Sequence, residues 1–181
     1  SACNNSVPNN TYSITGCQKL SNSGGEGDNG DSDFFLVELN SEPDFDPFFA
    51  GWDRTNSAAS SGVSIHHPSG DIMKISTFTN SLYTTGGLGF GNDNTTHWGV
   101  VWSQTTNGHG VTEGGSSGSS IFNQNGLVTG VLTGGASYCD ATNQSDVYGK
   151  VWHAWDQMGN TNDKQLKPWL DPVNANVITL N

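Results

Sequence analysis

The sequence predicts an all-β fold with one short helix near its end. Its 181 residues include 24 glycines, and the apolar residues fall in short runs between Gly, Asn, Asp and Pro. Such runs are typical of strands joined by tight turns. Only residues 152–158 space their apolar groups as a helix does, and Gly159 follows as a candidate C-cap. Short strands at this spacing favour a small antiparallel barrel.

The first 32 residues are polar, and the Gly- and Asp-rich residues 24–33 that close them are interpreted as a solvated loop. Residues 28–33 hold three Asp and one Asn, whose oxygens suit calcium, but the twelve-position calcium-loop pattern is absent. No Cys-x-x-Cys or His-x-x-x-His spacing suggests zinc. We therefore expect no cofactor and no metal, with calcium at residues 28–33 left as the alternative.

An apolar strand is expected at residues 33–39. It begins with Asp33, which is either a turn residue or a buried acid that orients a histidine. The Pro- and Asp-rich residues 41–47 follow and read as a linker. We therefore expect two units, residues 1–46 and residues 47–181.

The second unit alternates short strands and turns. Its expected strands are residues 50–54, 62–68, 71–78, 98–102, 121–122, 127–132 and 146–151. The Gly-rich residues 86–94 read as a mobile loop, and residues 123–126 end in Asn-Gly, a strong hairpin signal. Residues 166–172 are interpreted as a packed tail punctuated by prolines.

The chain is strongly acidic, with a formal charge of −11. Nucleic acids and anionic membranes are therefore poor partners, because binding phosphate groups requires clustered Lys and Arg. No apolar run approaches the ~18 residues that a membrane-spanning helix needs. The charge itself indicates solubility.

Residues 112–121 are the most informative stretch. They contain three glycines and four serines and lead into the apolar pair Ile121–Phe122. Ser117 lies in a Gly-x-Ser-Gly pattern, which can expose one hydroxyl and direct backbone N–H groups at one point, as acyl transfer requires. A flexible Gly/Ser loop is the alternative on these residues alone.

The segments taken together, in their order and spacing, resemble the trypsin-like serine peptidases, most closely the bacterial lysyl endopeptidases. The resemblance covers almost the whole chain. It rests on residues 32–40, 50–54, 65–68, 95–97, 111–113, 115–119, 134–139, 145–151 and 169–172.

This resemblance implies two antiparallel β-barrels with the active site between them, of which this chain holds the second barrel and the end of the first. Ser117 matches the nucleophile, and the N–H groups of Gly115 and Ser117 match the oxyanion hole. Asp33 matches the acid of the catalytic triad. Asp146 matches the acid of the pocket that receives a basic side chain, and Gly134 matches the edge that pairs with the substrate backbone.

Three positions depart from the trypsin pattern. Val111 replaces the pocket aspartate of trypsin, so Asp146 must supply that charge. Ser116 replaces the aspartate that captures a newly cut N-terminus, so that activation step is not expected. Thr133 stands where many relatives line the substrate cleft with an aromatic residue or a histidine.

The catalytic histidine of the family is missing, because no histidine precedes Asp33. None of the five present has the family's sequence context: His66, His67, His97, His109 and His153. A packing or turn role is expected for His66 and His67, and His109 is the one to test for proximity to Ser117. We expect an upstream fragment of the same precursor to carry the histidine.

Three cysteines leave an odd thiol. In the family, the cysteines that match Cys3 and Cys139 pair with upstream cysteines of the first barrel. A local bridge between Cys3 and Cys17, with Cys139 free, is the alternative.

The sequence thus predicts a secreted serine endopeptidase that cuts peptides and proteins after lysine, with any signal peptide already removed. A catalytically silent homologue that binds lysine-bearing peptides is the alternative. A carbohydrate-binding module would rest only on aromatics such as Trp98 and Trp102, which are more often core.

Overall fold

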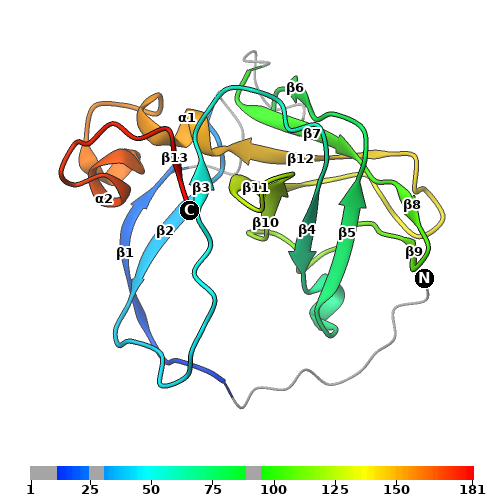
Figure 1. The fold of residues 1–181 in the computed structure, drawn as a ribbon, viewed down its shortest axis with the longest axis horizontal. Coiled ribbons are helices and arrows are strands. Elements are labelled where there is room, and N and C mark those ends of the chain that lie inside the picture. Colours follow the sequence, from blue (N-terminus) through cyan, green and yellow to red (C-terminus); the bar gives the residue numbers. More distant parts are fainter. Residues whose placement is uncertain (1–11, 25–30, 89–94) are drawn as a thin grey trace.

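The computed structural model describes residues 12–24, 31–88 and 95–181. These residues form β-sheets with a few short helices (Figure 1), which confirms the predicted all-β class. Among them every strand pair is antiparallel except β3 with β11. No helix in these ranges has the length and apolarity to cross a membrane.

The largest sheet runs in the spatial order β5–β4–β10–β11–β12–β7–β6, with β3 paired to β11 and β13 paired to β3. The bounds of these strands are β3 Trp52–Asp53, β4 Gly62–His66, β5 Lys74–Phe78, β6 Tyr83–Thr85, β7 His97–Val101, β10 Ser120–Asn123, β11 Val128–Gly135, β12 Ser145–Lys150 and β13 Thr179–Leu180.

Two smaller sheets and the helices complete the chain. The small sheets pair β1 Cys17–Asn22 with β2 Phe35–Leu39, and β8 Gln104–Thr105 with β9 Gly108–His109. The helices are η1 Pro68–Gly70, α1 Val151–Asp156, η2 Asn162–Lys164 and α2 Lys167–Leu170.

One apolar core fills the interior of the large sheet. Its buried members come from the strands and from the segments beside them: Ala59, Phe78, Leu82, Trp98, Val100, Trp102, Ile121, Leu132 and Tyr148. Large aromatic side chains bury much apolar surface each, so they dominate the stabilisation of this core.

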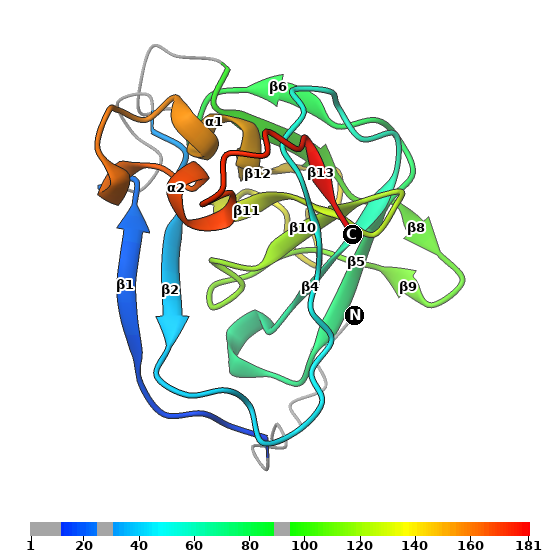
Figure 2. The same ribbon diagram turned by 60° about the vertical axis from the view of Figure 1, so that its left-hand side comes forward.

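A second core joins the beginning of β2 to the C-terminal helices. Phe34 is buried with Trp52, Trp155 and Leu166, and the rings of Trp52 and Trp155 lie 4.6 Å apart. Figures 1 and 2 show the β1–β2 hairpin at one side of the large sheet, next to α2. Phe34 thus fixes the chain just before β2 against the rest of the molecule.

The predicted Asn-Gly hairpin is confirmed. Asn123 ends β10, and its side-chain Oδ1 accepts hydrogen bonds from the N–H groups of Asn125 and Leu127. Gly126 has a φ of 76°, which a glycine adopts without strain.

Two local predictions are corrected. No strand was assigned among residues 1–32, but strand β1 forms there, because its ladder with β2 satisfies the backbone of this mostly polar segment. Helix α1 begins at Val151, assigned above to a strand, and its C-cap is Gln157 rather than Gly159. Of the predicted loop 86–94, residues 89–94 lie outside the described residues.

Candidate active site

The segment 111–120 is folded into consecutive tight turns that present Ser117. The N–H of Ser116 donates to the carbonyl of Glu113 at 2.9 Å, and that of Ser119 donates to Ser116 O at 3.1 Å. Gly118 N–H reaches across to Leu132 O on β11 at 3.0 Å. The chain is therefore tied on both sides of Ser117, whose own side chain is exposed.

Glycine makes this shape possible at two positions. Gly115 has a φ of 91° and Gly118 a φ of 82°, values in the region that side chains other than glycine rarely adopt. Within the described part of the chain, the backbone N–H groups of Gly115 and Ser117 donate to no other residue. Two donors beside one exposed hydroxyl are the elements of an oxyanion hole.

A cleft of about 740 Å³ lies in front of Ser117. It brings together four parts of the chain: the start of β2, Leu88 after β6, residues 117–120 and residues 131–133 of β11. Its lining residues are Asp33, Phe34, Phe35, Leu88, Ser117, Gly118, Ser120, Val131, Leu132 and Thr133. Three of the predicted site residues, Asp33, Ser117 and Thr133, therefore share one cleft.

Asp33 occupies the N-terminal side of β2 in an unusual backbone conformation. Its φ is 49°, and its N–H donates to Asp31 Oδ1 at 3.2 Å. Aspartate enters this region more readily than most residues, yet strain of this kind is concentrated at functional sites. Buried Phe34 follows directly and anchors the position.

Thr133 lies at an irregularity in the ladder between β11 and β12, where the register shifts between Leu132 and Gly134. Bulges of this kind redirect a side chain and are common beside active sites. Thr133 Oγ1 is 3.0 Å from Nε2 of His97, whose Nδ1 is 2.7 Å from Thr96 Oγ1. Thr133 is thus held from behind the cleft.

Gly134 follows Thr133 and lies against Leu88. A Cβ at Gly134 would come within 2.9 Å of Leu88 Cδ1, so a larger residue would push on the cleft wall.

The burial of His97, together with the nearby His153 and Lys150, lowers the pKa of His97 to about 4. His97 is therefore neutral at neutral pH.

Asp146 on β12 is fully buried and surrounded by hydrogen-bond donors. Its Oδ2 accepts from Trp102 Nε1 at 2.6 Å, from Thr112 Oγ1 at 2.8 Å and from Ser137 Oγ at 2.7 Å. Its Oδ1 accepts from the N–H of Ser137 at 3.1 Å. Thr112 belongs to the segment that leads to Ser117, so Asp146 and that loop are directly linked.

Gly135 on β11 lies directly against the carboxylate of Asp146. This glycine is exposed, and any side chain on it would overlap Asp146 Oδ1. Asp146 is not among the residues that line the 740 Å³ cleft. The predicted pocket acid is therefore buried beside β11, and the absence of a side chain at Gly135 leaves room next to Oδ1.

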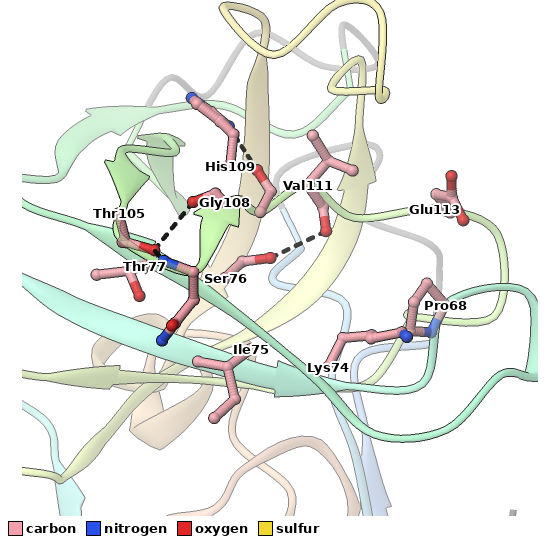
Figure 3. A pocket seen from close by; sticks show the side chains of 12 residues that line it. Pro68, Lys74, Ile75, Ser76, Thr77, Thr105, Gly108, His109, Val111 and Glu113 are labelled. Atoms are coloured by element: carbon pink, nitrogen blue, oxygen red, sulfur yellow. Dashed lines mark hydrogen bonds between the residues drawn. The ribbon is translucent and has the colours of Figure 1, made fainter. Parts of the chain in front are cut away.

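The five histidines are all described, and none lines the cleft. His109, the candidate for contact with Ser117, instead lies in β9 and lines a separate pocket of about 160 Å³ with Ser76 and Val111 (Figure 3). Its Nδ1 lies 2.9 Å from Gly110 O. His66 contacts Ser116, the neighbour of Ser117, a connection that the sequence did not reveal.

Of the cysteines, Cys17 is a free, exposed thiol at the start of β1, and Cys3 lies outside the described residues. Cys139 is exposed, and its Sγ is 3.8 Å from Glu113 Oε1. No group of three or more His, Cys, Asp and Glu residues in the described ranges is arranged to hold a metal ion.

Comparisons with known proteins give this geometry a family. The family described as "Lysyl endopeptidase, C-terminal domain" matches residues 1–149. A lysyl endopeptidase of Pseudomonas aeruginosa is 37% identical over 122 residues, covering 64% of this chain. The chain spans only 24% of that relative's length. This chain belongs to the family of lysyl endopeptidase C-terminal domains.

Proposed function

We propose that this chain forms the nucleophile-bearing part of a secreted serine endopeptidase that cleaves after lysine. The observation that carries the proposal is the cleft shared by Ser117 and Asp33, two residues that are 84 positions apart in the sequence. The match to the lysyl endopeptidase family supports the reaction class.

In the proposed mechanism, Ser117 Oγ attacks the carbonyl carbon of the scissile peptide bond while a histidine takes its proton. The oxyanion that forms accepts hydrogen bonds from the N–H groups of Gly115 and Ser117. Asp33 holds the histidine in the required tautomer and stabilises its protonated form. The histidine then gives its proton to the leaving amine, and water hydrolyses the acyl-enzyme.

Asp146 is the proposed receptor for the lysine ammonium of the substrate. A buried carboxylate that has lost its water favours a cation over a neutral side chain, which would leave part of its charge uncompensated. Oδ1 has an acceptor site left and faces Gly135, whereas Oδ2 already accepts three hydrogen bonds. Thr133 and Gly134 line the path of the substrate backbone.

The histidine comes, in this proposal, from a preceding segment of the same precursor that completes the first barrel. Phe35 and Leu39 on β2 are 63% and 49% exposed, and a two-stranded sheet such as β1–β2 has little stability of its own. Further strands laid on this hairpin would cover both side chains. They would also bring a histidine between Asp33 and Ser117. Residues 1–46 are thus assigned to the first barrel and residues 47–181 to the second.

The proposal is tested with a fluorophosphonate probe on the protease assembled with the segment that precedes this chain. The probe should label Ser117, and Ser117→Ala should abolish both labelling and cleavage of lysyl peptides. Ser119→Ala is the matched control, because Ser119 lies in the same loop with a buried hydroxyl, and it should still be labelled. Labelling that survives in Ser117→Ala contradicts the assignment. An unlabelled assembly that binds lysine-bearing peptides indicates the catalytically silent homologue.

A further inference from the structure

A buried hydrogen-bond chain holds the loop beside Ser117. It passes from Glu113 N–H to Ser116 Oγ (3.2 Å), then to His66 Nδ1 (2.8 Å). It continues from His66 Nε2 to Ser76 Oγ (3.1 Å) and ends at Val111 O (3.0 Å; Figure 3). The side chains of His66, Ser76 and Ser116 are all at least 98% buried.

The donor and the acceptor of each hydrogen bond in this network can be assigned in one consistent way. The carbonyl of Val111 can only accept, so the hydroxyl of Ser76 donates to it and must itself accept from His66 Nε2–H. In the neutral ring Nδ1 therefore carries no proton and accepts the hydroxyl proton of Ser116. Ser116 Oγ in turn accepts from Glu113 N–H. The network thus selects the neutral Nε2–H tautomer of His66.

Both ends of this network lie in the segment that shapes the oxyanion hole, and its middle lies on two strands. His66 ends β4 and Ser76 is central in β5, so the network fastens residues 111–116 to the large sheet. A second contact supports it, because Ser69 N–H donates to Gly114 O at 2.7 Å. A Cβ at Gly115 would come within 3.4 Å of His67 O, so the turn after β4 packs against the loop.

We propose that His66 is a positioning residue of the proposed peptidase, whose neutral form fixes Ser116 and the Gly115–Ser117 turn for oxyanion binding and whose protonation in acid loosens that turn. This inference rests on the proposed function and adds a control of the same site. If Nδ1 of His66 gained a proton, it could no longer accept the hydrogen bond from the hydroxyl of Ser116. That hydroxyl would then have to turn away and lose its present acceptor. The added proton would also place a positive charge in a buried position.

Several charged and titratable groups face His66. Burial lowers the pKa of His66, and His67, the residue that follows β4, lowers it further. Asp146 on β12 and Glu113 in the loop act in the opposite direction, and the effect of burial is larger than either. The loosening is therefore expected below pH 6.5, the ordinary value for histidine.

Two substitutions distinguish the roles of the two ring nitrogens of His66. In His66→Asn the side-chain oxygen can take the place of Nδ1 and accept from Ser116, whereas in His66→Gln the amide reaches the place of Nε2 and leaves Ser116 without its acceptor. In the assembled protease, His66→Gln should lower kcat by on the order of tenfold or more with KM little changed. Ser116→Ala should do the same, and the double variant His66→Gln/Ser116→Ala should lose little more.

His66→Asn should keep a kcat near that of the wild type at neutral pH. As the pH is lowered, kcat of His66→Asn should decrease with the uptake of one proton, by the catalytic histidine. In the wild type, kcat should decrease with the uptake of two protons, one by the catalytic histidine and one by His66. Equal kcat values in His66→Gln and the wild type, or identical acid limbs in His66→Asn and the wild type, overturn the proposal.

A measurement without turnover keeps the inference separate from the proposed function. Nitrogen NMR of the wild-type protein should show His66 protonated at Nε2 alone. The amide resonances of Gly115 and Ser117 should shift with the titration of His66, and this coupling should vanish in Ser116→Ala. An Nδ1–H tautomer, or amides that ignore this titration, overturns the positioning role. A protein that shows the coupling but neither labels nor cleaves contradicts the peptidase and not the network.

Discussion

The carboxylate of Asp146 shows how one buried charge can be kept in the interior of a small sheet. An isolated carboxylate away from water is costly, but four donors from Trp102, Thr112 and Ser137 surround this one. Every partner points a hydrogen at it. An amide at this position would direct its NH2 group at one of these donors and would carry no charge.

Asp146→Asn is therefore expected to lower kcat/KM of the assembled protease for lysyl peptides by on the order of a hundredfold or more. Asp140→Asn removes an exposed acid six positions earlier and should leave the preference for lysine unchanged. Steady-state kinetics on matched lysyl and neutral peptides measure both variants. If Asp146→Asn keeps its selectivity for lysine, another group forms the pocket.

Single residues also mark how far sequence interpretation reached. The family resemblance placed Asp33, Ser117 and Thr133 in one site, and the structure brings all three to one cleft. The bond from Trp102 to Asp146 and the bond from His66 to Ser116 were not anticipated. Their partners are 44 and 50 positions apart, and no local pattern encodes such pairings.

Among the secondary-structure elements too, those with a local sequence signal could be predicted and those that depend on distant partners could not. Strands with apolar alternation and the Asn-Gly hairpin were predictable because their signals are local. Strand β1 was not, because Cys17–Asn22 is polar and becomes a strand through its ladder with β2. The boundary between β12 and α1 was displaced for a related reason: Val151 suits a strand locally, but it packs in the second core as the first residue of the helix.

A neutral histidine joins strands β7 and β11 by a side-chain hydrogen bond. His97 on β7 is fully buried, and its Nε2 contacts Thr133 at the irregularity of β11. Its pKa in the folded protein, about 4, lies below the ordinary 6.5. Between these values the unfolded chain binds more protons than the folded one, so the free energy of unfolding falls as the pH falls.

His97 alone should account for a loss of about 3 kcal/mol in the free energy of unfolding between pH 7 and pH 4. His97→Gln removes this titration while keeping a polar side chain near Thr133. Its free energy of unfolding, measured in urea, should therefore fall less steeply with acid than that of the wild type. Parallel curves for the two proteins would show that His97 does not contribute to the acid sensitivity.

At the scale of the whole molecule, the β1–β2 hairpin is a sheet separate from the large sheet. The large sheet encloses its own aromatic core, whereas β2 leaves Phe35 and Leu39 substantially exposed. The cleft with Ser117 lies where the two parts meet. A site built at such a meeting point depends on how firmly the hairpin side is completed.

We expect Cys139, together with Cys3, to link the completing segment covalently to this chain. In the mature protease we expect non-reducing mass spectrometry to give a species heavier than 19.2 kDa that reduction splits into this chain and a histidine-containing fragment. The double variant Cys3→Ser/Cys139→Ser should prevent that link, because the family resemblance pairs both cysteines upstream, whereas Cys17→Ser, which removes another exposed thiol, should not. An unchanged mass of 19.2 kDa before and after reduction would contradict the linked assembly.

The crowding of Asp146 Oδ2 has a consequence for the kind of cation that the proposed pocket accepts. Three donors already occupy Oδ2, so an incoming side chain meets Oδ1 alone. A guanidinium binds carboxylates best as a fork across both oxygens, whereas an ammonium is a compact charge satisfied by one oxygen and by nearby carbonyl groups. Arginine would therefore leave part of its fork without an acceptor, so we expect the same four hydrogen bonds that keep the acid buried to favour lysine over arginine in the proposed pocket.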